Sequence, residues 1–201
     1  ATTAKRWFVL SQWDTAQSQL DVNSGLLRLN ANTDIRYARD GNTGTNTINL
    51  NGGAITFYSD NATTVGGSGV LDMHLGYGGT VVNTFNLNGG TLTVPAVLSA
   101  NASGTRIFNF NGGTIKPTAS SATFFNLGTG TTRANVRDGG VILDTDGKDV
   151  TFVSLLLHSD IVGDAATDGG LTKIGAGALT MAGGYDYTGP TKVLAGTLIL
   201  N

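Results

Sequence analysis

Hydrophobic and polar residues alternate through much of this chain, most clearly in the segment TFNLNGGTLTV at residues 84–94. Phe85 and Leu87 alternate with Asn86 and Asn88, and two glycines follow. A second alternating run, TLTV, comes directly after the glycines. A period of two is typical of a β-strand. The pattern therefore predicts two short strands joined at a glycine corner.

The same arrangement of strand, corner and strand recurs along the chain. Seven corners can be aligned on a glycine, at Gly25, Gly53, Gly90, Gly113, Gly140, Gly170 and Gly196. Their successive differences are 28, 37, 23, 27, 30 and 26 residues, mostly too short for a propeller blade of about 40–50 residues. One turn of a parallel β-helix, with three short strands and three turns, agrees better. The sequence therefore predicts a single all-β domain over residues 1–201, a parallel β-helix (β-solenoid) of about seven coils.

Stacked coils bring equivalent residues of successive repeats together. Neighbouring strands lie about 4.8 Å apart, so seven coils predict a rod of about 30–35 Å. Inward apolar residues then form a continuous core, side-chain amides hydrogen-bond from coil to coil, and glycines allow a positive φ at each corner. The predicted structural ladder comprises Asn49, Asn86 and Asn109 in one file, Asn51, Asn88 and Asn111 in a second, and the corner residues Gly53, Gly90 and Gly113. An alternative role for the asparagine row is contact with a carbohydrate.

The repeat changes in the segment NVRDGG. Alignment on its glycines puts Arg137 at the position of Phe110 in FNFNGG. Two explanations are open. Either the strand slips by one residue at a bulge, or this corner of the coil is more open.

Composition narrows the range of functions. The 201 residues are 40% hydrophobic, which is enough for a core, but only 13% are charged and the net charge is −2. We therefore expect no nucleic-acid partner, and no apolar run is long enough for a membrane span. The absence of cysteine excludes disulfide and thiol chemistry. All 14 acidic residues are aspartate, and good helix formers are scarce, which agrees with an all-β chain.

The segment at residues 169–200, GGLTKIGAGALTMAGGYDYTGPTKVLAGTLIL, carries a denser motif. Its ordered positions are Gly170, Leu171, Lys173, Gly175, Gly177, Leu179, Tyr187, Gly189, Thr191, Val193, Gly196 and Leu198. This motif resembles the autotransporter-associated β-strand repeat of passenger domains in bacterial surface proteins. The resemblance implies a right-handed parallel β-helix that is extracellular or displayed on the bacterial cell surface. It implies no catalytic residues.

Carboxylates cluster in the segment DTDGKD, where Asp144, Asp146 and Asp149 surround a glycine. Oxygen ligands on a tight turn make this cluster a weak candidate for calcium. The chain has no glutamate to complete an EF-hand loop, and an Asp-Gly turn between strands is the simpler interpretation. We expect no other cofactor.

The histidines and a second group of aspartates give weaker signals. His74 and His158 both lie in apolar, strand-like surroundings without a third metal ligand nearby. Asp160, Asp164 and Asp168 are spaced by four residues, as on one face of a helix. Glycines interrupt that segment, so the sequence predicts a polar loop instead.

Some parallel β-helices are polysaccharide lyases or hydrolases, and these need paired carboxylates or an arginine or lysine base. Asp138 or Asp144 with Arg133 or Arg137 are the candidates here. No spacing singles them out. The chain is therefore not expected to be an enzyme.

The ends of the predicted solenoid are candidate sites of association, because a solenoid exposes unpaired strands at each end unless an atypical element caps it. Residues 1–20 contain Trp7 and Trp13 on an amphipathic run, a candidate cap or docking segment. The other end carries Leu198 and Leu200 without a cap. We expect either head-to-tail association of copies or cover by adjoining coils of a longer passenger.

Three functions remain open, in order of preference. The first is a non-enzymatic extracellular structural subunit that forms a surface or extracellular fibre. The second is an adhesin or stalk module of the passenger type that binds glycans or host surfaces, which an exposed aromatic row would favour. The third is a polysaccharide lyase or hydrolase.

Overall fold

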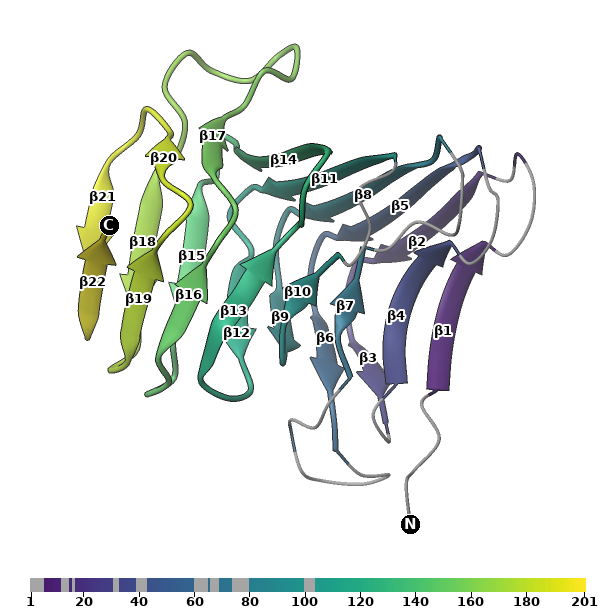
Figure 1. The fold of residues 1–201 in the computed structure, drawn as a ribbon, viewed down its shortest axis with the longest axis horizontal. Coiled ribbons are helices and arrows are strands. Elements are labelled where there is room, and N and C mark those ends of the chain that lie inside the picture. Colours follow the sequence, from purple (N-terminus) through teal and green to yellow (C-terminus); the bar gives the residue numbers. More distant parts are fainter. Residues whose placement is uncertain are drawn as a thin grey trace.

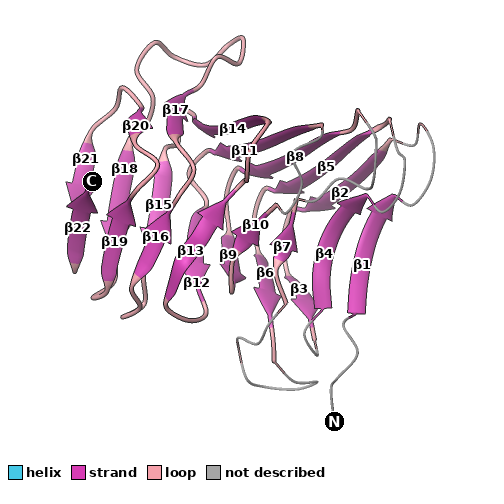
Figure 2. Ribbon diagram, viewed as in Figure 1, coloured by secondary structure: helices cyan, strands magenta, loops and turns pink. Residues whose placement is uncertain are grey.

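A computed structural model of the chain describes residues 6–11, 15, 17–30, 33–38, 43–59, 65, 69–73, 80–99 and 104–201. Within these residues every regular element is a strand, and 22 strands wind along one long axis (Figures 1 and 2). They form three sheets in which every pairing of the named strands is parallel. The structure confirms the prediction of an all-β, right-handed parallel β-solenoid.

Each sheet contains every third strand of the chain. Sheet A has eight strands in the order β1 (Arg6–Ser11), β4 (Thr33–Ala38), β7 (Leu71–Asp72), β10 (Val97–Leu98), β13 (Ser121–Asn126), β16 (Val150–Phe152), β19 (Ala178–Met181) and β22 (Thr197–Leu200). Sheet B has seven, namely β2 (Ser18–Val22), β5 (Thr45–Leu50), β8 (Val82–Leu87), β11 (Thr105–Phe110), β14 (Thr131–Val136), β17 (Leu156–His158) and β20 (Tyr185–Asp186). Sheet C has seven, namely β3 (Leu26–Leu29), β6 (Ala54–Phe57), β9 (Thr91–Val94), β12 (Thr114–Pro117), β15 (Val141–Asp144), β18 (Leu171–Ile174) and β21 (Thr191–Val193).

One coil therefore consists of one strand from each sheet, as predicted. Strands β1, β2 and β3 form coil one, and strands β19, β20 and β21 form coil seven. Strand β22 then begins a further turn in sheet A. The described strands thus make seven complete coils.

The pairing register corrects the glycine alignment in coil seven. Gly196 lies between β21 and β22, at the corner from sheet C to sheet A, whereas the other six glycines lie between sheets B and C. The equivalent corner in coil seven contains Pro190, whose carbonyl oxygen accepts a hydrogen bond from Leu171 N at 3.0 Å. Leu171 pairs with Thr191, so this coil advances the chain by only 20 residues.

The corner between β14 and β15 explains the changed pattern in NVRDGG. Phe110 pairs with Val136, and Thr114 pairs with Ile142. Three residues separate the paired positions in coil four, and five residues separate them in coil five. Strand β14 keeps its register with β11 along its whole length, and Arg137 follows the strand. Of the two explanations for the changed pattern, the more open corner is therefore correct, and the one-residue slip at a bulge is wrong.

The core is a continuous column of inward apolar side chains. Phe85 and Leu87 of β8 are fully buried, whereas the alternate residues of that strand are partly exposed. Phe85 stacks on Phe108 of the next coil with ring centroids 4.9 Å apart and planes inclined by 6°. Phe125 and Phe152 stack at the same centroid distance, 4.9 Å. Such ring pairs add about 0.5–1.5 kcal/mol to the area they bury.

Candidate functional site

The last coil leaves one side of its core uncovered. No described strand pairs with β20, β21 or β22 on that side, at the yellow end in Figure 1. Leu198 and Leu200 pair with buried residues of β19 and therefore point toward the core. Leu198 packs against it, and Leu200 is 51% exposed. Val193 and Tyr185, at inward positions of β21 and β20, are each 45% exposed. We call this surface, formed by these four side chains, the C-terminal face.

Among the described strands, none pairs with the outer edge of the first coil, and we call the surface at this edge the N-terminal face. Phe8 of β1 pairs with a buried isoleucine, so it points inward, and it is 37% exposed. Leu10, Leu20 and Leu27 are partly buried against the same core. The described part of residues 1–20 contains β1 and the start of β2. These strands of coil one pair with β4 and β5 of coil two, respectively. Both ends of the solenoid therefore present apolar side chains framed by edge strands of all three sheets.

Trp7 lies beside the N-terminal face and does not form it. Because Phe8 points inward, its neighbour Trp7 points to the outer surface of sheet A. The guanidinium carbon of Arg36 lies 4.7 Å from the centre of its ring, a cation–π contact. Trp13 lies outside the described residues. The orientation of Trp7 therefore argues against a place for it in end-to-end contacts.

A buried ammonium group joins three coils near the C-terminal face. Lys173 of β18 is fully buried. Its Nζ has three N–H donors and lies within hydrogen-bond distance of four acceptors, namely Thr145 Oγ1 at 2.9 Å, Ile174 O at 3.1 Å, Gly175 O at 2.8 Å and Ala195 O at 3.0 Å. These acceptors belong to coils five, six and seven. Lys173 therefore acts as a cross-link between successive coils.

The surroundings of Lys173 are closely packed. Burial lowers the pKa of its ammonium group, and the carboxylates of Asp144 and Asp149 oppose that change. Gly196 has a φ of 70°, and a Cβ at this position would lie 2.7 Å from Lys173 Nζ. This structural role of Lys173 is not evident from the motif alone, although the period of two in LTKI places Lys173 on the same side as the buried Leu171.

The first file of asparagines forms a hydrogen-bonded ladder on the outer face of sheet B. Asn86 Nδ2 donates to Asn49 Oδ1 at 2.6 Å, and Asn109 Nδ2 donates to Asn86 Oδ1 at 2.7 Å. The ladder continues in both directions, because Asn49 donates to Asp21 at 2.7 Å and Asn135 donates to Asn109 at 2.8 Å. Each internal amide uses one donor and one acceptor in this way. Structure alone therefore accounts for the repeated asparagine.

The second file runs along the corner between sheets B and C. Asn51 donates to Asn23 at 2.8 Å, Asn88 donates to Asn51 at 2.8 Å, and Asn111 donates to Asn88 at 3.4 Å. In coil five, where the repeat changes, the backbone N–H of Gly139 donates to Asn111 Oδ1 at 2.9 Å. A main-chain donor thus takes the place of the missing amide.

The corner glycines do not all have the expected conformation. Gly53 and Gly90 have φ of 66° and 64°, and a Cβ on Gly90 would lie 2.4 Å from the carbonyl oxygen of Gly53. Gly113 does not have a positive φ, and Gly112 takes the left-handed conformation with φ of 92°. The prediction for Gly113 is wrong because the longer corner of coil five changes the contact, so that Gly112 N donates to Gly140 O at 3.0 Å.

Removal of one ladder amide tests its contribution. The Asn86→Ala change leaves the side-chain oxygen of Asn49 and the side-chain nitrogen of Asn109 without their partner. We expect the free energy of unfolding to fall by about 1–2 kcal/mol more than in Thr84→Ala, a change on the same face of the same strand. Urea denaturation followed by circular dichroism measures the difference. Equal losses in the two variants would contradict the ladder's role.

The calcium candidates have other partners. Lys116 Nζ lies 3.5 Å from Asp144 and 3.1 Å from Asp146, and Lys148 Nζ lies 2.7 Å from Asp146. Asp149 Oδ1 accepts a hydrogen bond of 2.8 Å from the first backbone N–H of β19. Among the residues that the structure describes, no group of three or more His, Cys, Asp or Glu is placed to hold a metal ion. Each of the three carboxylates thus contacts a lysine or a backbone N–H group.

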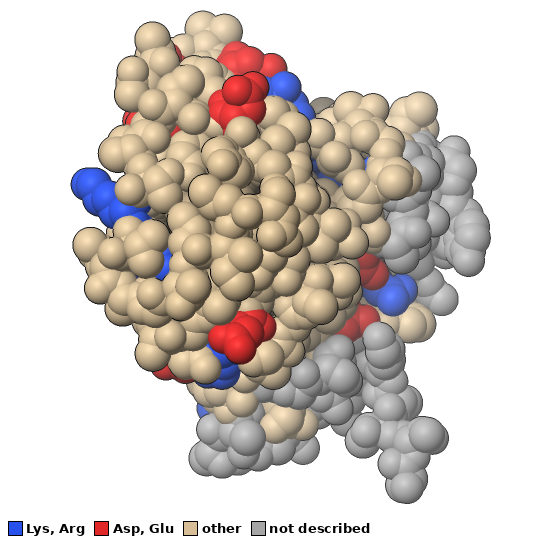
Figure 3. Space-filling view, turned by 60° about the vertical axis from the view of Figure 1, so that its left-hand side comes forward, with Lys and Arg blue, Asp and Glu red and all other residues tan. Residues whose placement is uncertain are grey.

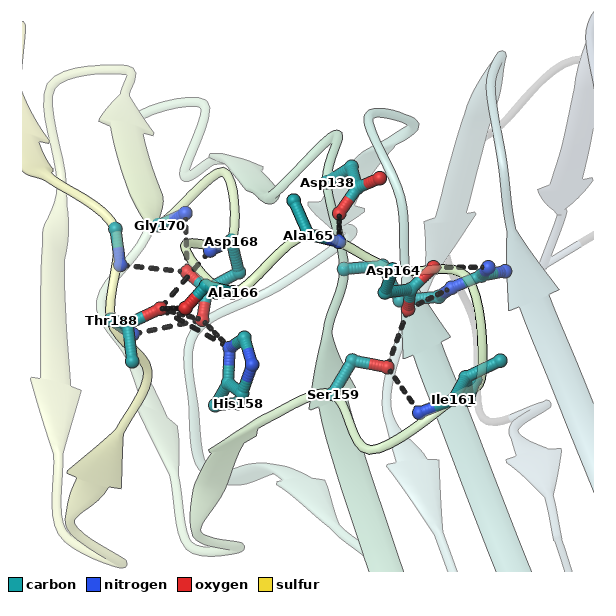
Figure 4. A network of polar contacts seen from close by, with 12 residues as sticks. Asp138, His158, Ser159, Ile161, Asp164, Ala165, Ala166, Asp168, Gly170 and Thr188 are labelled. Atoms are coloured by element: carbon teal, nitrogen blue, oxygen red, sulfur yellow. Dashed lines mark hydrogen bonds and ion pairs between the residues drawn. The ribbon is translucent and has the colours of Figure 1, made fainter.

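The glycine-interrupted segment after β17, residues 159–170, is a loop as predicted, and it projects from the solenoid (Figures 1 and 4). Arg137 donates two hydrogen bonds to Asp164, at 2.8 and 2.6 Å, and lowers the pKa of that carboxyl. Ser159 Oγ donates to the same carboxylate at 2.5 Å. Asp138 accepts a backbone N–H of the loop at 2.8 Å. These bonds hold the loop against coil five.

Asp168 attaches the end of this loop to coil seven (Figure 4). Its Oδ1 accepts the backbone N–H groups of Gly170 and Gly189, both at 2.9 Å, and its Oδ2 accepts that of Thr188 at 2.8 Å. His158 Nδ1 lies 2.8 Å from Oδ2. Burial raises the pKa of the Asp168 carboxyl, but the hydrogen bonds outweigh burial, so the pKa lies below its ordinary value.

The contact of aspartate, histidine and threonine at this point does not have the geometry of a catalytic triad. The hydroxyl of Thr188 lies 3.2 Å from His158 Nδ1, the same ring nitrogen that faces Asp168. In a triad the carboxylate and the nucleophile contact opposite nitrogens of the ring. This cluster therefore supports structure, not activation of the hydroxyl. His74 lies outside the described residues.

The arginines considered for catalysis are paired with carboxylates of the same loop. Arg137 binds Asp164, and Arg133 Nη1 lies 3.3 Å from Asp160. The two candidate carboxylates have the backbone and lysine partners described above. Asp138 lies near Arg137 and raises the pKa of its guanidinium, but the hydrogen-bonded ion pair of Arg137 is with Asp164.

The loop carboxylates predict sensitivity to acid. Asp164 and Asp168 have lowered pKa values in the folded chain, so their stabilising effect is complete above the unfolded value of about 3.9 and is lost as the pH falls through the folded value. We expect the thermal midpoint to fall as the pH is lowered below about 4. The Asp168→Asn variant should show a weaker dependence. A midpoint that does not change between about pH 6 and about pH 3 would contradict this assignment.

One broad face of the molecule carries few charged side chains. Figure 3 shows a broad face of mostly uncharged side chains, with charged residues in small separate groups. In the described part of the chain, no helix is long and apolar enough to cross a membrane.

The fold and its open faces define a parallel β-solenoid, and its C-terminal part matches a known repeat. Residues 171–200, which contain β18 to β22, match the family described as passenger-associated-transport-repeat. This match confirms the resemblance predicted from the motif. Comparison with curated proteins and comparison with solved structures gave no match. The repeat indicates an autotransporter passenger-type β-helix and a bacterial cell-surface or extracellular location.

Proposed function

We propose that this chain is a non-enzymatic structural solenoid of the bacterial exterior that associates head to tail through its two open faces. The observation that carries the proposal is the exposure of inward apolar side chains at both ends, including Leu200 at 51% and Phe8 at 37%. Contiguous apolar surface of this kind is typical of interaction sites. The carboxylates of Asp164 and Asp168 are hydrogen-bonded to other groups of the same chain, which supports a structural role for these clusters over a catalytic one.

Sheet A supplies the contact in this arrangement. Strand β1 of a second copy pairs in parallel with β22, so that Phe8 and Leu10 of one copy cover Leu198 and Leu200 of the other. Sheet A has eight strands and the other two sheets have seven. The junction therefore leaves a gap of one strand in sheets B and C, and each copy adds eight strand spacings, about 38 Å, to the length of the fibre.

The passenger repeat supports a second way of covering the C-terminal face, within one longer chain. Its match to residues 171–200 supports a long passenger in which adjoining coils cover the C-terminal face. Both forms cover Leu198 and Leu200, but only head-to-tail association depends on the concentration of the chain.

Sedimentation velocity of the purified chain over a range of concentrations distinguishes the two forms. Head-to-tail association predicts a sedimentation coefficient that rises steadily with concentration. The contact is apolar, so the rise should persist at high salt. A single monomeric species at every concentration would refute the fibre.

A further inference from the structure

A groove lies between coils five and six, at the corner where the chain passes from sheet A to sheet B. Its volume is about 530 Å³, within the range of about 300–1,000 Å³ typical of small-molecule sites. Its lining comes from β13, β14 and the corner between them in coil five, and from β17 and the segment before it in coil six. Gly183 of coil seven completes the lining. None of the side chains that form the two open faces lines the groove, so its lining is distinct from the contact proposed above.

A difference in corner length creates the groove. Phe125 pairs with Phe152 in sheet A, and Ala134 pairs with Leu156 in sheet B. Eight residues lie between the paired positions in coil five, but only three lie between them in coil six. The first half of β14 therefore extends beyond β17, whose three residues pair only with the second half. The longer corner forms a ledge next to the shorter one.

Several polar side chains of the groove have hydrogen-bonding groups that no described residue uses. Asn126 Oδ1 accepts the N–H of Gly128 at 2.9 Å, which fixes the side-chain amide. In the described chain, no side-chain hydrogen bond uses Asn126 Nδ2 or the hydroxyls of Thr129 and Thr132. Ser154 Oγ accepts the N–H of a leucine at 2.8 Å, so its own proton is available. The groove thus combines amide donors with hydroxyl groups that can donate or accept.

The opposite side of the groove is apolar except for Ser154, and the whole lining is uncharged. Val153, Leu155 and Leu157 lie on this side, and Leu155 is 42% exposed. No ionisable side chain occurs in the lining. A ligand that matches this surface has several hydroxyl groups on one side, an apolar C–H surface on the other, and no charge. A pyranose ring of a neutral saccharide has these properties.

We propose that this groove binds a residue of a neutral saccharide. An extended peptide is the main alternative, because the first half of β14 is an unpaired edge. Only residues 131–133 are unpaired toward β17, and strand addition relies on a longer run of main-chain hydrogen bonds. The free side-chain donors on the ledge favour hydroxyl groups as the ligand.

Saturation-transfer-difference NMR tests this site on the intact chain, in its monomeric or its associated form. The probes are methyl α-D-glucopyranoside, methyl β-D-galactopyranoside and N-acetylglucosamine, with glucuronate as an anionic comparison and a short threonine-rich peptide as the peptide comparison. We expect transfer to at least one neutral probe and weak transfer to the other two classes. Thr132→Val, which keeps the shape of the side chain and removes its hydroxyl, should weaken binding by about three- to tenfold.

The control is Thr84→Val, which makes the same change on the outer face of sheet B and should leave binding unchanged. A second variant, Thr129→Val, should weaken binding as Thr132→Val does, and circular dichroism checks that each variant is folded. The proposal is overturned by no transfer to any neutral probe, by binding that survives both groove changes, or by preferential binding of glucuronate or the peptide.

Discussion

The Lys173→Met variant is expected to lose about 3–5 kcal/mol of the free energy of unfolding. Methionine keeps a flexible apolar stem of similar length but removes the donor to one hydroxyl and three carbonyl oxygens. These acceptors lie in three successive coils, so the loss should be greatest in coils five to seven. Urea denaturation measures the total, and hydrogen exchange of residues 171–200 locates it.

Lys192→Met is the matched control, because Lys192 is exposed on the next strand of the same sheet. It should change the free energy of unfolding by less than about 0.5 kcal/mol. Equal stabilities of the two variants would show that the buried ammonium does not connect the coils.

The Leu200→Asp variant is expected to weaken association of the chain by at least about 100-fold, which corresponds to about 2.8 kcal/mol. An aspartate at this inward position of β22 would have to lose its hydration in the contact without gaining a partner. Leu200 is already 51% exposed in the single chain, so the fold should tolerate the change. Sedimentation velocity compares the variant with the unchanged chain.

Val162→Asp is the control for this variant. Val162 is fully exposed in the projecting loop and belongs to neither open face. The Val162→Asp change introduces the same charge as Leu200→Asp and should leave association unchanged. If both variants associate as the unchanged chain does, the contact does not involve the C-terminal face.

Much of the fold could be predicted because one pattern repeats. The alternation of Phe85 with Asn86, followed by two glycines, determines strand, corner and strand in several coils. Alignment on glycines alone was less reliable than strand register. Gly196 resembles the other corner glycines in sequence, yet it lies at a different corner because coil seven is short. The two extra residues after Val136 moved the positive φ from Gly113 to Gly112.

The sites were less predictable because they depend on which coils are neighbours. The sequence places Asp144 and Asp146 together, but the lysine that lies between them comes from the previous coil. The bond from Arg137 to Asp164 likewise joins residues 27 positions apart. Trp7 and Phe8 are both apolar, so the sequence alone does not tell which of them points inward.

The groove between coils five and six could not be predicted from the sequence for the same reason, because its lining depends on the neighbouring coil. Thr129 and Thr132 look like ordinary turn and strand residues in the sequence. Their exposure on a ledge follows from the length of the next corner, which only the register of Ala134 with Leu156 reveals.

Electron microscopy of the purified chain at high concentration tests the central claim most directly. Head-to-tail association through sheet A predicts unbranched filaments with an axial repeat of about 38 Å, or eight strand spacings, and these filaments should be absent in Leu200→Asp. Separate particles of single-chain size at the highest attainable concentration would contradict the account.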